Sequence, residues 1–154
     1  MDEAGLDNRI YRVYGRSLKG EKIYASIPGR KRERVSMIGG WIQNQFIAPM
    51  SFKGGCNNDV LNAWLLNVLL PDLSPGTTII MDNAAFHKSL KTREIVEAAG
   101  CFIKFLPTYS PDLNPIEHCW HSLKSRLRPL IQSGYDNMQD LVNRGLVDMM
   151  IGNT

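Results

Sequence analysis

The pattern of hydrophobic residues changes near residue 56, and this change constrains the fold more than any other feature of the chain. Before that point, polar and apolar residues alternate with the period of half-buried strands, in segments 9–14, 22–27, 34–42 and 45–52. After it, patterns with helical spacing occupy 60–69, 90–99, 114–130 and 138–150, and short apolar runs typical of interior strands occupy 77–81 and 101–106. A meander of strands followed by alternating helices and strands predicts a mixed sheet with helices on its faces, in the α/β (α+β) class.

Length and composition favour a single globular domain. The chain has 154 residues, of which 44% are hydrophobic and 21% charged, and these values exclude a disordered or fibrous protein. No apolar run reaches the roughly 18–20 residues of a membrane span, and the N-terminus lacks the apolar stretch of a signal peptide. The three cysteines are not arranged as a CxxC pair, which predicts free thiols in a reducing compartment. We therefore expect a cytoplasmic protein without a membrane partner.

Basic residues are concentrated near the start of the chain. Residues 1–40 contain nine Lys and Arg against five Asp and Glu, a local net charge of +4, whereas the whole chain carries +3. The densest cluster consists of Arg30, Lys31, Arg32 and Arg34. Such a cluster either binds a phosphate backbone or forms the solvated tip of a hairpin, and the sequence pattern leaves both readings open.

Asp82 follows the apolar run 77–81 directly. A carboxylate at the carboxyl end of a buried strand is well placed for metal binding or catalysis, because sites in such sheets form at strand ends. An aspartate in this position can instead cap the following turn by bonding to its own backbone. Residue spacing does not separate these two interpretations.

Glu117 also has two interpretations. The segment Asn114-Pro115-Ile116-Glu117 resembles a capping box, in which Glu117 would satisfy the first turn of a helix. The same helix would present His121, Lys124 and Arg128 on one polar face with Glu117. That face runs from acidic to basic, as expected for a metal at the first turn and phosphates along the helix. A solvated charged face is the alternative.

The acidic residues favour magnesium over zinc. His118, Cys119 and His121 lie close in sequence, but no second Cys/His pair completes a four-ligand zinc site. The N-terminal pair Asp2 and Glu3 would supply further carboxylates, although an acidic pair at the start of a chain is usually solvated and by itself indicates no site. Carboxylates from distant segments suit Mg²⁺, which keeps room for water and phosphate oxygens.

Two segments resemble a known family. Asp82-Asn83-Ala84-Ala85-Phe86-His87-Lys88 and the string Leu106-Pro107-Thr108-Tyr109-Ser110-Pro111-Asp112-Leu113-Asn114-Pro115-Ile116-Glu117 are similar to the catalytic region of mariner-allied bacterial insertion-sequence transposases. These belong to the DDE superfamily. The 34 residues between Asp82 and Glu117 fit that pattern, and Asp2-Glu3-Ala4-Gly5 resembles the family's first acidic motif. The resemblance implies an RNase H-like fold, with a five-stranded mixed sheet flanked by helices.

The resemblance implies a site and a reaction. Asp2, Asp82 and Glu117 would form the acidic triad that binds two Mg²⁺ or Mn²⁺ ions, and Asn83 and His87 would support the site. The implied reaction is hydrolysis of a phosphodiester at a transposon end, followed by transfer of the freed 3′-hydroxyl to target DNA. The implied partners are DNA and a second copy of the chain, with no small-molecule cofactor, in a bacterial cytoplasm near the nucleoid. Candidate DNA-binding residues are Arg30, Lys31, Arg32, Arg34, Lys88, Lys124 and Arg128.

Two departures from the family pattern lead to further expectations. Residues 1–154 are expected to form one catalytic domain, with the family's N-terminal DNA-binding domain absent. Because Asp2 stands at the start of the chain, the first strand is expected to be largely missing. This expectation supports an alternative function, a truncated, non-catalytic remnant that folds, dimerises or binds DNA without cutting it. A third reading keeps the metal chemistry but assigns branched DNA as the substrate, as in a Holliday-junction resolvase.

Overall fold

Strands and helices occupy most of the described chain. The structure is a computed structural model and describes residues 1–8, 18–22, 32–108 and 110–152. The strands in this part of the chain are β1 Asp2–Asp7, β2 Arg34–Ile42, β3 Gln45–Lys53, β4 Thr78–Met81 and β5 Phe102–Phe105. The α-helices in it are α1 Asn58–Trp64, α2 Leu90–Ala98, α3 Ile116–Ser133 and α4 Met138–Gly152. None of the described helices is both long enough and apolar enough to cross a bilayer.

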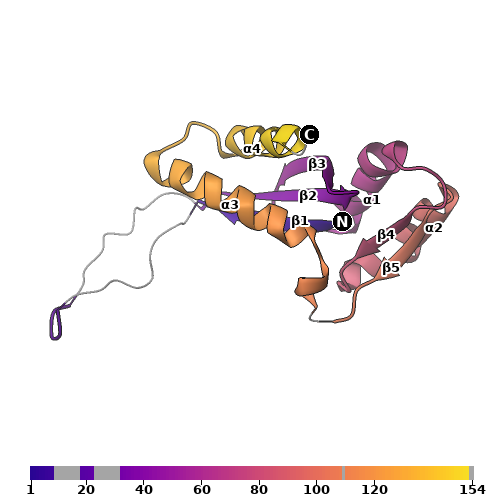
Figure 1. Ribbon diagram of the computed structural model, residues 1–154, viewed down its shortest axis with the longest axis horizontal. Coiled ribbons are helices and arrows are strands. Elements are labelled where there is room, and N and C mark those ends of the chain that lie inside the picture. Colours follow the sequence, from indigo (N-terminus) through magenta and orange to yellow (C-terminus); the bar gives the residue numbers. More distant parts are fainter. Residues whose placement is uncertain (9–17, 23–31, 109, 153–154) are drawn as a thin grey trace.

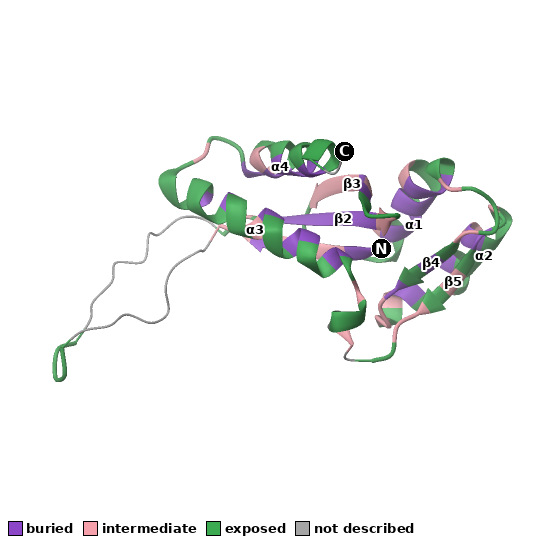
Figure 2. Ribbon diagram, in the orientation of Figure 1, coloured by how far each residue is buried: buried purple, intermediate pink, exposed green. Residues whose placement is uncertain are grey.

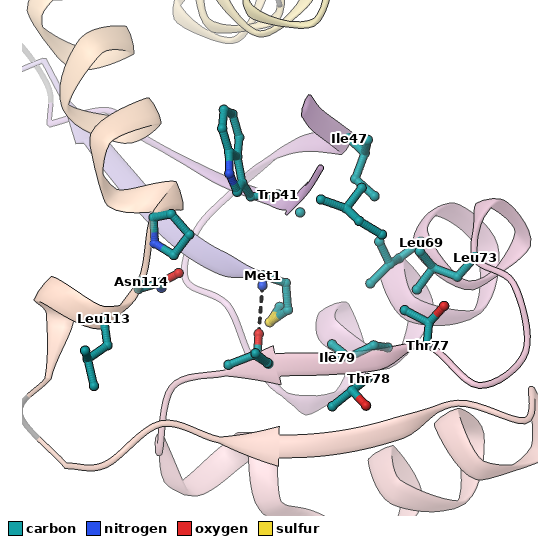
Figure 3. A pocket seen from close by; sticks show the side chains of 14 residues that line it. Met1, Trp41, Ile47, Leu69, Leu73, Thr77, Thr78, Ile79, Leu113 and Asn114 are labelled. Atoms are coloured by element: carbon teal, nitrogen blue, oxygen red, sulfur yellow. Dashed lines mark hydrogen bonds between the residues drawn. The ribbon is translucent and has the colours of Figure 1, made fainter. Parts of the chain in front are cut away.

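The strands form two small sheets (Figure 1). Strands β1, β2 and β3 pair antiparallel in that order, and β4 pairs parallel with β5. The nitrogen of Met1 donates to the carbonyl oxygen of Ile80 at 2.8 Å and so links β1 to β4 (Figure 3). The mixed α/β class is confirmed, but the prediction of one continuous five-stranded sheet is wrong for the described residues. β1 and β4 are joined by this bond and do not form a ladder.

The first strand is formed, which corrects the expectation that it is largely missing. All six residues of β1 pair with β2, from Asp2 opposite Gly39 to Asp7 opposite Arg34. Asp2 stands at the beginning of this ladder. The observation that motivated the non-catalytic alternative therefore does not hold.

The other predicted elements agree closely with the structure. Segment 34–42 coincides with β2, and β3, β4, β5, α2, α3 and α4 lie within a few residues of their predicted bounds. Asn57 caps α1, because its side chain accepts from the backbone N–H of Val60 at 3.0 Å. The predicted helix over 60–69 continues past α1 as a π-helical turn, Leu65–Leu69. The predicted strand 9–14 and nearly all of 22–27 lie outside the described residues.

Two hydrophobic cores pack against opposite faces of the three-stranded sheet, because the adjacent β2 residues Met37 and Ile38 belong to different cores. Figure 2 shows that β2, which lies between them, is buried over most of its length. The first core joins that sheet to the apolar faces of α3 and α4, and Trp120 is buried in it. The second joins the sheet to α1, the π-helical turn and β4, and Trp64 is fully buried there. A further cavity of about 150 Å³ lies between the end of β2 and β4 and is lined partly by Met1, Trp41 and Leu69 (Figure 3).

Gly39 packs tightly beside the first core, and we expect Gly39→Val to destabilise the domain. A Cβ atom here would stand 2.7 Å from the ring of Phe46 and 3.3 Å from Trp120. These rings are packed edge to face, with centroids 5.3 Å apart, so neither moves freely. Overpacking of this kind costs about 1–3 kcal/mol of unfolding free energy, which urea denaturation measures. Gly55→Val is the matched control, because a Cβ atom at Gly55 would have nothing within 4 Å; an equal effect at both positions would contradict the packing explanation.

Candidate active site

Three carboxylates from distant parts of the chain line one cavity. Asp2 begins β1, Asp82 follows β4 and Glu117 lies in the first turn of α3. All three face a cavity of about 230 Å³. The other lining residues are Asn83, Ala84, Leu106, Pro107, Thr108, Ser110 and Asn114. The structure therefore brings together the predicted acidic residues and the predicted supporting residue Asn83.

Asp2 is the most buried carboxylate of the three, with 7% of the residue exposed. Burial first, and then the negative charges of Glu117, Glu3 and Asp82, raise the pKa of Asp2 to about 7, against a lowering backbone hydrogen bond from Glu3. A carboxylate in this environment gains from any nearby positive charge, because its own charge is poorly solvated and faces other acids.

Asp82 is held by its own turn and by His87. Its Oδ1 atom accepts a hydrogen bond from the backbone N–H of Ala84 at 3.0 Å and lies 2.5 Å from Nδ1 of His87. The turn-capping interpretation is therefore confirmed, but it does not exclude a role in the cavity. Both contacts use Oδ1, and the side chain remains 47% exposed at the cavity.

His87 does not line the cavity but lies behind Asp82. Its side chain is fully buried, and its Nε2 atom lies 3.2 Å from Oε2 of Glu3. Burial lowers the pKa of His87, but the hydrogen bond and charge of Glu3 and the contacts with Asp82 outweigh it, so the net pKa is raised. Sequence reasoning did not assign Glu3 to the site. The available signal was strand alternation, which directs Asp2 and Glu3 to opposite faces of β1.

Glu117 is exposed and does not form the predicted capping box. The helix N-cap is Pro115, which makes no side-chain capping bond. The backbone N–H of Glu117 donates to the carbonyl oxygen of Asn114 at 3.1 Å, so the first turn is satisfied by the main chain. The Glu117 carboxylate is therefore left facing the cavity.

The predicted DNA-binding residues fall into separate places. Lys88 ends a short 3-10 turn next to His87, and Lys124 and Arg128 follow Glu117 along α3. Arg32 and Arg34 lie at the far end of the β1–β2 ladder from Asp2, where Arg32 pairs with Asp7 at 2.9 Å. Arg30 and Lys31 lie outside the described residues. DNA contact by all of these residues remains a prediction.

The carboxylates do not form a finished metal centre by themselves. Within residues 1–8, 18–22, 32–108 and 110–152, no three His, Cys, Asp or Glu side chains stand close enough to hold an ion as they are placed. The donor set nevertheless fits a hard divalent cation, since Asp2, Asp82 and Glu117 all offer oxygen and share one cavity.

Comparison with known proteins connects this site to a family. Residues 1–140 match the family model described as DDE superfamily endonuclease. Over 67 residues the chain is 36% identical to the transposable element Tc1 transposase of Caenorhabditis elegans, covering 44% of this chain and 24% of that protein.

Solved structures show the same fold. The Mos1 strand transfer complex matches with a TM-score of 0.58 and 19% identity, over 99% of this chain and 51% of that one. The Mos1 transposase paired-end complex with left transposon end matches with a TM-score of 0.58 and 17% identity, over 99% of this chain and 52% of that one. The chain thus spans about a quarter of the curated relative and about half of the Mos1 chains, and its fold is RNase H-like. Since the family model spans the triad and most of the chain, this protein belongs to the DDE superfamily endonuclease family.

Proposed function

We propose that this chain is the catalytic domain of a DNA transposase. It would hydrolyse a phosphodiester at a transposon end and transfer the resulting 3′-hydroxyl to target DNA. The observation that carries the proposal is the convergence of Asp2, Asp82 and Glu117 on one cavity, in a chain of the DDE superfamily endonuclease family. The similar proteins include a transposase and a strand transfer complex, which supports the same reaction here.

Mg²⁺ or Mn²⁺ ions would be held by the three carboxylates. Mos1 paired-end complexes have been solved with each of these metals, which supports a divalent ion in the present chain. When bound, such ions activate a water or a 3′-hydroxyl and stabilise the leaving oxygen. The chain's own contribution is to place Asp82 against a rigid turn and Glu117 on a helix end, so that both carboxylates face the same space.

DNA would approach the cavity along α3. Arg128 is exposed and Lys124 half-buried on the same helix as Glu117, and Lys88 is exposed beside the Asp82 turn. These cations are suited to phosphate oxygens that flank a scissile bond. We also propose that the active form is a homodimer, as the family resemblance implies.

The test is whether the 154-residue protein nicks DNA in a metal-dependent manner. We expect supercoiled plasmid to be nicked in Mg²⁺ or Mn²⁺ and to remain intact in EDTA, as read on an agarose gel. The absence of nicking with either metal would contradict the proposal. Comparing a four-way junction with linear duplex separates it from a junction resolvase, because a resolvase would cut the branched substrate preferentially.

A further inference from the structure

Three side chains in contact with one another connect the two sheets behind the cavity. Glu3 belongs to β1 in the three-stranded sheet, and Asp82 follows β4 in the two-stranded sheet. His87 lies between them, with Nε2 at 3.2 Å from Glu3 and Nδ1 at 2.5 Å from Asp82. Each imidazole nitrogen thus contacts a carboxylate on a different sheet. Apart from this connection, the ends of β1 and β4 are linked by the Met1–Ile80 hydrogen bond.

Burial makes this connection well defined. The His87 side chain has no exposed surface, and the Glu3 side chain is 20% exposed. The imidazole also packs against Phe86, with ring centroids 4.3 Å apart. A ring held by packing and by contacts at both nitrogens has a fixed orientation, so it can transmit the position of Glu3 to the Asp82 carboxylate.

The strand geometry gives the two neighbouring acids of β1 different tasks. Asp2 lines the cavity, whereas Glu3 contacts His87 and lines a separate depression with Arg34 and Cys56. Adjacent residues on a strand point to opposite faces, so one rigid element sets both carboxylate positions. Asp2 is placed directly, and Asp82 is placed through His87.

We propose that Glu3 and His87 are positioning residues that fix Asp82 relative to Asp2 for binding of a divalent metal. The inference rests on the proposed function, in which Asp82 is a metal ligand. Without the bridge, Asp82 would keep its turn bond to Ala84 but lose its link to β1. Its carboxylate would then spend less time where Asp2 and Glu117 can share an ion with it.

The experiment compares Mn²⁺ affinity by isothermal titration calorimetry in wild type, Glu3→Gln, Glu3→Asp and His87→Asn. We expect each substitution to weaken Mn²⁺ binding by about 10- to 100-fold, the usual effect of removing a group that orients a metal ligand. Glu3→Asp keeps the charge but withdraws the carboxylate by one methylene, so it separates position from charge. Because all three variants break one bridge, the double variant Glu3→Gln/His87→Asn should bind little more weakly than either single variant.

Asp7→Asn is the matched control. Asp7 is a carboxylate on the same strand and face as Glu3, but it pairs with Arg32 at the far end of β1, so wild-type Mn²⁺ affinity is expected. Thermal melts without metal show that each variant is folded at the titration temperature. If Glu3→Gln or Glu3→Asp binds Mn²⁺ as tightly as the wild type does, that result overturns this inference alone. Absence of Mn²⁺ binding by the wild type would overturn the proposed function as well.

Discussion

Asp82→Asn and Glu117→Gln are each expected to reduce metal-dependent DNA nicking by at least about 1000-fold. Both substitutions keep the size of the side chain but remove a charged oxygen from the shared cavity. Stabilisation of a phosphoryl transition state by bound metal is worth several kcal/mol, and each 1.4 kcal/mol is about tenfold in rate. The measurement is the initial rate of plasmid nicking under saturating Mn²⁺, with rates followed for long enough to detect residual turnover.

These losses should occur without unfolding. Neither carboxylate supports a core, since Asp82 is half exposed and Glu117 is exposed. Asp112→Asn is the matched control, because Asp112 lies in the turn before α3, is exposed and does not line the cavity. We expect it to nick DNA at the wild-type rate. Near-normal nicking by Asp82→Asn or Glu117→Gln would remove these residues from the active site.

The second large expected effect is a loss of folding stability that Asp2 causes in the metal-free protein as the pH rises. Its pKa is raised from the ordinary value of 3.8 to about 7, first by burial and then by Glu117. A raised folded-state pKa means that the folded protein binds the proton more tightly than the unfolded chain. The contribution of Asp2 to stability is therefore fully present below about pH 4 and is lost as the pH rises through 7. At about 1.4 kcal/mol for each tenfold change in proton affinity, a rise in pKa from 3.8 to about 7 corresponds to a loss of about 4 kcal/mol.

The measurement is the free energy of unfolding in urea from pH 4 to pH 8 in EDTA, for wild type and Asp2→Asn. The difference between the two isolates Asp2, because every other titrating group is common to both proteins. We expect the wild type to lose stability relative to Asp2→Asn up to about pH 7 and then to level off. Parallel curves for the two proteins would show that Asp2 carries no such penalty. Saturating Mg²⁺ should reduce the wild-type loss, since the ion neutralises the same charge.

Local sequence patterns predict most of the elements but not how the sheets join. The alternation in 34–42 and the apolar run 77–81 identify β2 and β4 closely, because each pattern reflects burial of that segment alone. The division into two sheets depends on how β1 meets β4, which is a contact between segments 79 residues apart. No pattern within either segment contains that information.

The site shows the same division. Asp82 and Glu117 are identifiable by their places at element ends and by the motif around them, and the structure brings both to one cavity. The role of Glu3 is hidden because an acid next to the start of the chain resembles any solvated residue until β1 is known to be a strand. The prediction of a capping box at Glu117 is wrong because main-chain bonds in the first turn of α3 replace it.

The carboxylates of the site are carried by elements that belong to two different hydrophobic cores. Glu117 is carried by α3, which belongs to the first core, whereas Asp82 follows β4, which belongs to the second. An ion shared by these carboxylates would act as a cross-link between the cores, so that neither could open without releasing it. Metal binding would then make the two cores, each stable on its own, unfold as one cooperative unit. Substitutions deep in either core would weaken metal affinity in proportion to how far they loosen that region.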